Sequence, residues 1–280
     1  LLGQSAGLIL VLMAFPESSV LSGPRIVAVI LITLALIGWF AAEKVPAAPA
    51  PAPELKVDYN PVTATLRVLG FALKDMNVFR PMLGVAWFYG LSTIFITAFP
   101  TYVADVMRYD QNVLTAILVA STVGILIGSL LCVVLARGRE AMGLCAFGII
   151  GVALFTLDLY LTGQTSTREE LGTISDFFAA PETPRFLIDV VGASLCNGLF
   201  VVPLQAMMQR RADPAKRARL MSAGSVMLNI SVNGFTFMLI GLGYLTLAPN
   251  FPFLIIVIVS TIVAIYAVHR ALQMKKAGTL

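Results

Sequence analysis

Apolar residues in this chain are gathered into long runs that short polar segments separate. A helix that crosses the hydrocarbon core of a bilayer needs about 20 mostly apolar residues, whereas a barrel strand alternates apolar and polar residues over about 10. The run FLIIVIVSTIVAIYAV is rich in β-branched residues but does not alternate, so we interpret it as a helix. The pattern predicts eight spanning helices, at residues 1–15, 25–42, 78–104, 112–136, 141–161, 186–209, 218–245 and 252–270.

Composition supports the same fold class. Of the 280 residues, 58% are hydrophobic and only 12% are charged, which is more apolar than a soluble domain of this length needs to fill its core. The three cysteines, Cys132, Cys145 and Cys196, all lie inside apolar runs and lack the spacing of metal ligands. We therefore predict an all-α membrane protein, with the cysteines as small packed residues, and we expect no metal site and no cofactor.

A segment that alternates Ala and Pro, EKVPAAPAPAPELKVDYNP, follows the second run and favours an extended spacer. The next segment places Leu66, Leu69 and Leu73 at helical spacing, which predicts an amphipathic helix at the membrane surface. The chain opens inside an apolar run without the basic region of a signal peptide, so we interpret it as a fragment. The predicted domains are the last two helices of an N-terminal half-bundle (1–42), a cytoplasmic linker with the amphipathic helix (43–77) and a C-terminal six-helix half-bundle (78–280).

The distribution of Lys and Arg predicts the orientation, because cytoplasmic loops of membrane proteins collect basic residues. If the first span runs outward, the outer side holds only four of the 19 basic residues, namely Arg25, Arg108, Arg168 and Arg185. The longest outer loop, GQTSTREELGTISDFFAAPETPR, is net acidic. Alternate loops agree throughout, so we expect a multi-pass protein of a bacterial inner membrane with both ends of the chain in the cytoplasm.

One inner loop is densely basic, with five charges in the segment QRRADPAKRAR. These residues are Arg210, Arg211, Lys216, Arg217 and Arg219. The flanking spans favour a cytoplasmic loop that sets orientation and contacts anionic lipid headgroups. Nucleic acid is not an expected partner, because no aromatic residues are interleaved and no soluble domain is present to offer a groove.

Three long stretches carry a resemblance to a known family: VFRPMLGVAWFYGLSTIFITAFPTYVADVM, LTAILVASTVGILIGSLLCVVLARGREAMGLCAFGIIGVALFTLDL and GLFVVPLQAMMQRRADPAKRARLMSAGSVMLN. They are similar to the lysophospholipid transporter family of the major facilitator superfamily, over about residues 58–245. The resemblance implies a partial major facilitator helical bundle, in which about eight transmembrane helices are equivalent to family helices 5–12. Family helices 1–4 would then lie outside this sequence.

The resemblance also implies a function. Members move lysophosphatidylethanolamine and related lysophospholipids across the inner membrane for reacylation, and some are fused to an acyltransferase and an acyl-carrier-protein ligase. The expected partners are therefore membrane lipids, the lysophospholipid substrate and an acyltransferase or acyl-ACP ligase. Two alternatives stay open: an exporter of small solutes or drugs from the same superfamily, and the membrane domain of a fused acyltransferase or ligase whose catalytic parts are absent here.

A polar stripe in the run 218–245 is the first candidate site. Five residues fall within an arc of about 80° at 100° per residue, namely Ser222, Ser225, Asn229, Asn233 and Thr236. Polar groups at bilayer depth usually face the bundle interior or a water-filled path, so the stripe could offer hydrogen bonds to a phosphate or glycerol group. Interhelical hydrogen bonding uses the same residue types and is the competing interpretation.

The run 186–209 adds the cavity candidates Asn197 and Gln205. Two carboxylates lie near the predicted outer ends of their spans, Asp189 and Asp158, and either could act as a gate or carry a proton. Asp189 lies four residues after Arg185, so a local ion pair or a solvated helix end is an equal alternative.

Aromatic and small residues complete the list. Trp87 and Tyr89 lie one to two turns from the inner end of the run 78–104, where interface anchoring is the default interpretation. The resemblance favours contact with substrate for at least one of them, because family helix 7 borders the cavity. Small residues recur every fourth position at Ala116, Ala120, Gly124 and Gly128, which predicts close approach of another helix.

An enzyme is the competing class. Acyltransferases fused to this family use a His followed five residues later by Asp, with the His as general base. The only histidine here, His269, has Met274 at that distance. No Gly-rich phosphate loop, metal cluster or Ser/His/Asp set appears, and no selectivity-filter segment suggests a channel. We therefore predict no catalytic activity within this chain.

Overall fold

The computed structural model describes residues 23–45, 60–137, 141–162, 170–213, 217–244 and 250–276. The chain divides into two units, Leu1–Tyr59 and Asn60–Leu280, each with its own internal contacts. In the first unit the helix α2 (Gly23–Glu43) occupies the predicted second span. Large apolar side chains on all of its faces are exposed, among them Val29, Leu34 and Trp39. A helix that is apolar on every face suits a lipid environment. The predicted first span, 1–15, lies outside the described residues.

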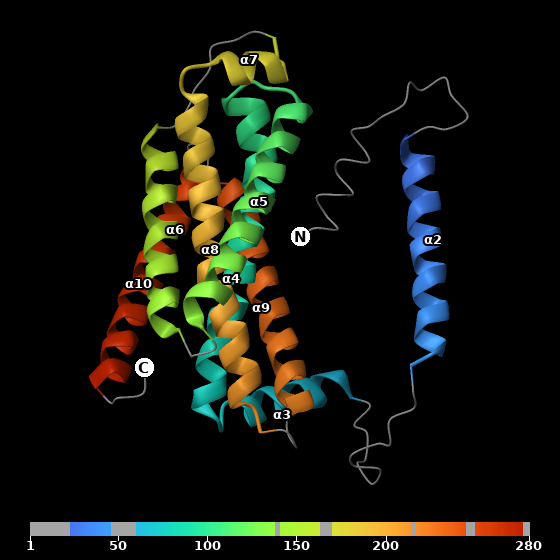
Figure 1. Cartoon of the computed structure of the whole chain (residues 1–280), viewed down its shortest axis with the longest axis vertical. Coiled ribbons are helices and arrows are strands. Elements are labelled where there is room, and N and C mark those ends of the chain that lie inside the picture. The colour runs from blue at the N-terminus through green and yellow to red at the C-terminus, as the bar shows by residue number, and fades with distance from the viewer. Residues whose placement is uncertain are drawn as a thin grey trace. The chain divides into compact units, whose positions relative to one another are not determined.

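The second unit consists of helices (Figure 1). In chain order they are α3 (Pro61–Ala72), α4 (Met76–Thr101) with a π-helical extension η1 (Tyr102–Val106), α5 (Gln111–Ala136), α6 (Met142–Thr162), α7 (Ile174–Ala179), α8 (Thr183–Arg211), α9 (Arg217–Gly243) and α10 (Phe251–Lys276). Six of the described helices, counting α4 with η1 as one, are long and apolar enough to cross a membrane. They match the last six predicted spans, so the chain is a multi-pass, all-α membrane protein.

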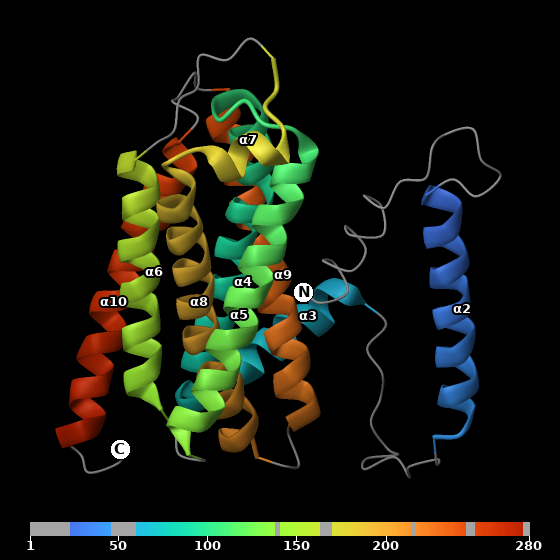
Figure 2. The same cartoon turned by 45° about the horizontal axis from the view of Figure 1, so that its top comes forward.

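The long helices run alternately up and down, so the unit has two ends. We call the end where α4 begins and α8 and α10 finish the α3 end, and the opposite end the α7 end (Figure 1). Helix α8 lies between α5 and α6 in both views and packs closely against each of them (Figure 2). Helix α9 packs against α4, and α10 packs against α6. Helix α9 therefore lies at one edge of the unit and α10 at another.

Glycines make the closest helix contact possible. A Cβ atom added at Gly128 of α5 would overlap the carbonyl oxygen of Leu195 in α8, and one added at Gly124 would lie 2.6 Å from the carbonyl oxygen of Val191. A backbone atom cannot move aside as a flexible side chain can, so only glycine fits. The predicted small-residue contact is confirmed at these two positions, and α8 is the helix that approaches.

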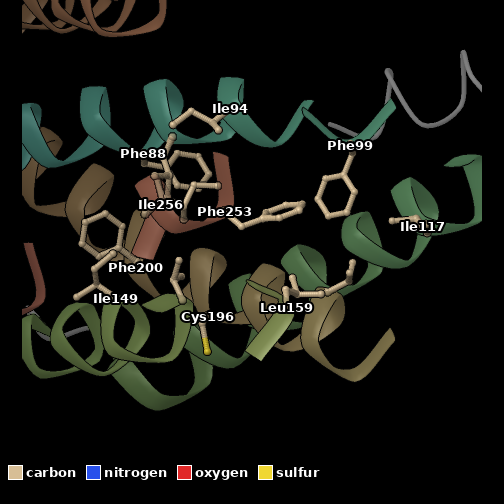
Figure 3. Packing of buried hydrophobic residues seen from close by; sticks show 14 of the residues in the cluster. Phe88, Ile94, Phe99, Ile117, Ile149, Leu159, Cys196, Phe200, Phe253 and Ile256 are labelled. Atoms are coloured by element: carbon tan, nitrogen blue, oxygen red, sulfur yellow. The ribbon is translucent and has the colours of Figure 1, made fainter. Parts of the chain in front are cut away.

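The core of the second unit is aliphatic and aromatic (Figure 3). Ile94 of α4, Ile117 of α5, Ile149 of α6 and Ile256 of α10 are completely buried. Phe253 of α10 contacts Phe99 and Tyr102 with ring centroids 5.5 and 5.0 Å apart. Side chains from four helices and η1 thus interlock and hold the bundle together.

A cap that the apolar pattern did not predict closes the α7 end. The predicted outer loop contains α7, whose first turn carries a reciprocal capping box between Thr173 and Asp176. Phe177 of α7 is fully buried, with its ring 5.3 Å from that of Tyr109. Backbone hydrogen bonds from Gly172 to Arg108 and from Asp110 to Gly172 hold the segment before α7 against the connection between η1 and α5.

The predicted amphipathic helix corresponds to α3. It packs against α9 and α4 through Leu69, Phe71 and Ala72, while Leu66 is 63% exposed. The packed side therefore differs from the predicted stripe: Leu69 packs against the neighbouring helices, whereas Leu66 and Leu73 are exposed. Helix α3 belongs by contacts to the second unit. Its position relative to a membrane surface stays a prediction.

Candidate functional site

The polar stripe of α9 lies on the surface of the second unit. Ser222, Ser225, Asn229 and Asn233 are exposed and Thr236 is half-buried. The buried side of α9 consists of Leu220, Ala223 and Met227, which pack against α3, α4 and the end of α8. The stripe therefore points away from the helices to which α9 is attached.

The hydrogen bonds of the stripe stay within α9. The side-chain amide of Asn229 donates to the carbonyl oxygen of Ser225 at 2.8 Å, and that of Asn233 donates to the carbonyl oxygen of Asn229 at 2.8 Å. Thr236 donates in the same way to Val232 at 2.8 Å. Each amide keeps a second N–H and its oxygen for another partner. Among the described residues, these side chains make no hydrogen bond to another helix.

All stripe residues except Thr236 line an open groove, which we call the α9 groove, with a volume of about 590 Å³. Thr65 of α3 stands at one side of it. Apolar side chains of Val226, Ile230 and Phe237 lie in the same groove as Ser222, Ser225, Asn229 and Asn233. The groove thus presents hydrogen-bonding groups and hydrocarbon surface next to each other, which is the combination that an amphiphile requires.

A second and more apolar space lies near the α3 end, between α3, α4, α6, α8, α9 and α10. Its volume is about 660 Å³. Aliphatic, aromatic and sulfur-containing side chains form most of its wall, among them Leu69, Phe79, Leu204, Met207 and Val263. Three arginines also line it, Arg80, Arg211 and Arg270. We call this space the arginine-lined cavity.

The two predicted aromatic candidates, Trp87 and Tyr89, lie in different surroundings. Trp87 lines the arginine-lined cavity and meets Phe200 edge to face, with ring centroids 5.5 Å apart. Its indole nitrogen is buried without a hydrogen-bond acceptor among the described residues. Tyr89 is 37% exposed, contacts Phe88 edge to face, and belongs to neither the groove nor the cavity.

The polar candidates of α8 also lie apart from both spaces. Asn197 is 7% exposed, and its side-chain oxygen finds no hydrogen-bond donor in the described part of the chain. Gln205 is half-buried. Neither residue lines the α9 groove or the arginine-lined cavity, so a direct substrate contact for them stays a prediction.

Three charged residues form a group at the α7 end. Arg185 of α8 makes a bidentate ion pair with Asp158 of α6, with nitrogen–oxygen distances of 2.9 and 2.6 Å. Asp189 is 4% exposed, interacts electrostatically with both residues, and has one carboxylate oxygen without a hydrogen-bond partner among the described residues. Arg185 therefore forms its hydrogen bonds with Asp158 of the neighbouring helix α6 and not with Asp189 of its own helix. A gating or proton-linked role for either carboxylate stays a prediction.

The predicted basic loop divides into two parts. Arg211 is half-buried, donates to the carbonyl oxygen of Asn77 at 3.2 Å, and lines the arginine-lined cavity. Arg210, Arg217 and Arg219 are exposed. Lys216 lies outside the described residues. The sequence did not predict that Arg80 and Arg270 line the same cavity as Arg211, because the three residues are far apart in the chain. The alternation of the spans indicated only that they lie at the same end of the unit.

A scan against protein-family models and searches of curated proteins and of solved structures found no match for this chain. The geometry offers two surfaces suited to amphiphiles, the α9 groove and the arginine-lined cavity. Among the described residues no group of three or more His, Cys, Asp or Glu side chains comes together as a metal site would require.

Proposed function

We propose that this protein is a secondary-type transporter that moves lysophospholipids of the lysophosphatidylethanolamine type across the bacterial inner membrane for reacylation. In this proposal it is related to the lysophospholipid transporter family of the major facilitator superfamily, whose stretches it resembles. The observation that supports it best is the polar stripe of α9. A spanning helix carries four exposed polar side chains over more than two turns, on the side that its neighbours in the unit leave open.

Such a face is costly in hydrocarbon. Backbone and side-chain polar groups in a bilayer must be satisfied within the protein or by water, and polar residues within spanning helices mark substrate or ion paths. Asn229 and Asn233 use only one N–H each within α9. The remaining groups therefore need a water-filled path, a ligand or a second helical body, and a transporter provides all three.

The composition of the α9 groove favours a lipid as the substrate. The amides of Asn229 and Asn233 suit the phosphate and glycerol oxygens of a lysophospholipid, and Ile230 and Phe237 suit its acyl chain. A purely polar solute would leave the apolar wall without a partner. The small-solute exporter is the alternative, and a fused acyltransferase or acyl-ACP ligase would use the delivered lysolipid.

The test is the inward movement of labelled lysophosphatidylethanolamine into proteoliposomes that contain the full-length protein. We expect uptake above protein-free vesicles, with competition by other lysolipids and none by water-soluble solutes. The double substitution Asn229→Leu and Asn233→Leu is expected to reduce the rate about tenfold, because each lost hydrogen bond is worth about 0.5–1.5 kcal/mol. Folding should be preserved, since among the described residues both amides bond only within their own helix.

The matched control is Thr261→Leu on α10. Thr261 is exposed and donates to the carbonyl oxygen four residues before it, at 2.7 Å from Val257, as the stripe residues do. We expect normal transport in this variant. A wild-type transport rate in the folded double variant would show that the α9 groove does not bind the transported substrate. Competition by small solutes would favour the small-solute exporter.

A further inference from the structure

We propose that the arginine-lined cavity is a binding site for one anionic, single-chain lipid, with the acyl chain inside the cavity and the charged headgroup at the arginines. This site is separate from the α9 groove, although Ile230 of α9 borders both. The proposal does not require the protein to transport anything. A bound lipid could occupy the cavity as a substrate on its way in or as a resident ligand.

The wall of the cavity selects an acyl chain. Most of its lining is contributed by residues such as Leu69, Leu204, Met207 and Val263, which offer no hydrogen bonds. Water in an apolar cavity lacks polar partners, so such spaces stay dry or take apolar ligands. The volume of about 660 Å³ falls in the range of about 300–1,000 Å³ that small-molecule sites occupy. An alkyl chain is the ligand that fills it without unmet polar groups.

The arginines select a negative charge. Arg80 lies near the start of α4, Arg211 ends α8 and Arg270 lies near the end of α10, so all three approach the cavity from the α3 end. None of the described residues that line the cavity is acidic. Arg211 donates to the Asn77 carbonyl and Arg270 to Gln273 at 2.7 Å, and a guanidinium has five N–H donors. Arg270 therefore keeps donors for an anion, and a bound anion would offset the positive charge that the arginines bring to the cavity.

The two halves of the site together identify the ligand class. An inorganic anion would bind the arginines and leave the apolar space empty, whereas a neutral alkane would fill the space and make no hydrogen bond to the arginines. Arginine stems pack along apolar surface while their heads stay at the polar edge, which matches the junction between a chain and a phosphate. Because five of the surrounding helices are long and apolar enough to cross a membrane, a lipid of the bilayer is the expected source of the ligand.

The tryptophans provide a direct readout. The chain contains two, Trp39 in α2 and Trp87 in the cavity wall. Trp39→Phe leaves Trp87 as the sole tryptophan of the sequence, and brominated acyl chains quench indole fluorescence on contact. The probe is lysophosphatidic acid with a brominated chain, titrated into nanodiscs of unbrominated phosphatidylcholine that hold the Trp39→Phe variant of the 280-residue chain. We expect saturable quenching at a low mole fraction of the probe.

Three variants in the Trp39→Phe background separate the contributions. Arg80→Gln with Arg270→Gln should raise the probe concentration for half-maximal quenching about tenfold or more, because charge-assisted hydrogen bonds are the strong ones. Val263→Phe should reduce the quenching by filling the cavity while leaving the arginines in place. Arg137→Gln is the matched control, since this exposed arginine follows the last residue of α5 at the same end of the unit and does not line the cavity.

The outcomes are distinguishable. Quenching that rises linearly with bromine content and never saturates would overturn the site, as would saturable quenching that Val263→Phe leaves unchanged in folded protein. Equal affinity of the double arginine variant and the Arg137→Gln control would overturn the anionic headgroup. Brominated lysophosphatidylcholine, which carries no net charge, should bind about tenfold more weakly. Saturable binding with no transport would refute the proposed function alone.

Discussion

At the scale of single residues, the absence of a side chain is as decisive as any contact. Gly128 permits the backbones of α5 and α8 to approach closely. A side chain at this position would collide with the backbone carbonyl of Leu195, so a smaller side chain at Leu195 would not make room for it. Arg185 illustrates the opposite case, since it has a carboxylate four residues away on its own helix and yet pairs with Asp158 of α6. Sequence spacing offered only the local partner Asp189, and the contact between α6 and α8 provided Asp158 instead.

Gly128→Ala should destabilise the protein. The added methyl group overlaps the Leu195 carbonyl oxygen, so α5 and α8 must separate, and overpacking of this kind costs about 1–3 kcal/mol. Thermal unfolding in detergent, followed by loss of the monodisperse peak on size exclusion, measures the effect.

The control for this prediction is Gly143→Ala in α6, where a new Cβ would meet no atom within 4 Å. Alanine is a better helix former than glycine, so this variant, at the second position of α6, should be as stable as the native protein or slightly more stable. Equal midpoints for the two variants would mean that α5 and α8 do not meet as closely as described.

At the scale of elements, α7 shows how a short segment can close one end of a bundle. Six residues are too few to be stable as an isolated helix, and α7 relies on its capping box and on burial of Phe177. Phe186 of α8 lies edge to face with Phe177 at 6.2 Å, and Thr183 donates a hydrogen bond to the Phe177 carbonyl oxygen. The cap thus ties the connection after η1 to the first turn of α8.

Phe177→Ala should lower the stability of the second unit substantially. Deleting a fully buried phenylalanine costs about 3–5 kcal/mol, and here it also removes the aromatic contact with Tyr109. The neighbouring substitution Phe178→Ala is the matched control, because this side chain is 60% exposed. It should change stability by no more than about 0.5 kcal/mol.

Denaturant unfolding of both phenylalanine variants in the same detergent measures the difference. Proteolysis within the connection around α7 offers a second, local readout, since loss of the Phe177 anchor should expose that segment to cleavage. A Phe178→Ala variant as unstable as Phe177→Ala would show that the whole segment, and not one anchor, holds the cap.

At the scale of the whole molecule, the distribution of charge bears on which way the protein faces. The α3 end carries Arg80, Arg137, Arg211 and Arg270, and the predicted topology places this end in the cytoplasm. Cytoplasmic loops collect such residues. The anionic lipid site proposed above would then lie at the inner leaflet.

Labelling of single introduced cysteines tests this orientation. The native cysteines are at most 4% exposed, so a membrane-impermeant maleimide should react slowly with them. In intact cells Glu170→Cys, next to the α7 end, should be labelled, whereas Arg219→Cys should react only after lysis. Both positions are exposed in the structure. The reverse pattern would place the α3 end outside and would overturn the predicted topology.

The sequence alone determined where the six described spanning helices of the second unit lie and which residues form the α9 stripe, because both follow from local patterns of apolar and polar residues. Gly124 and Gly128 were likewise recognisable from their spacing. Tertiary structure decided which faces meet: it paired Arg185 with Asp158, buried the Phe177 side chain of α7, and brought Arg80, Arg211 and Arg270 to one cavity. These choices depend on helix packing between residues distant in the chain, which no local pattern encodes.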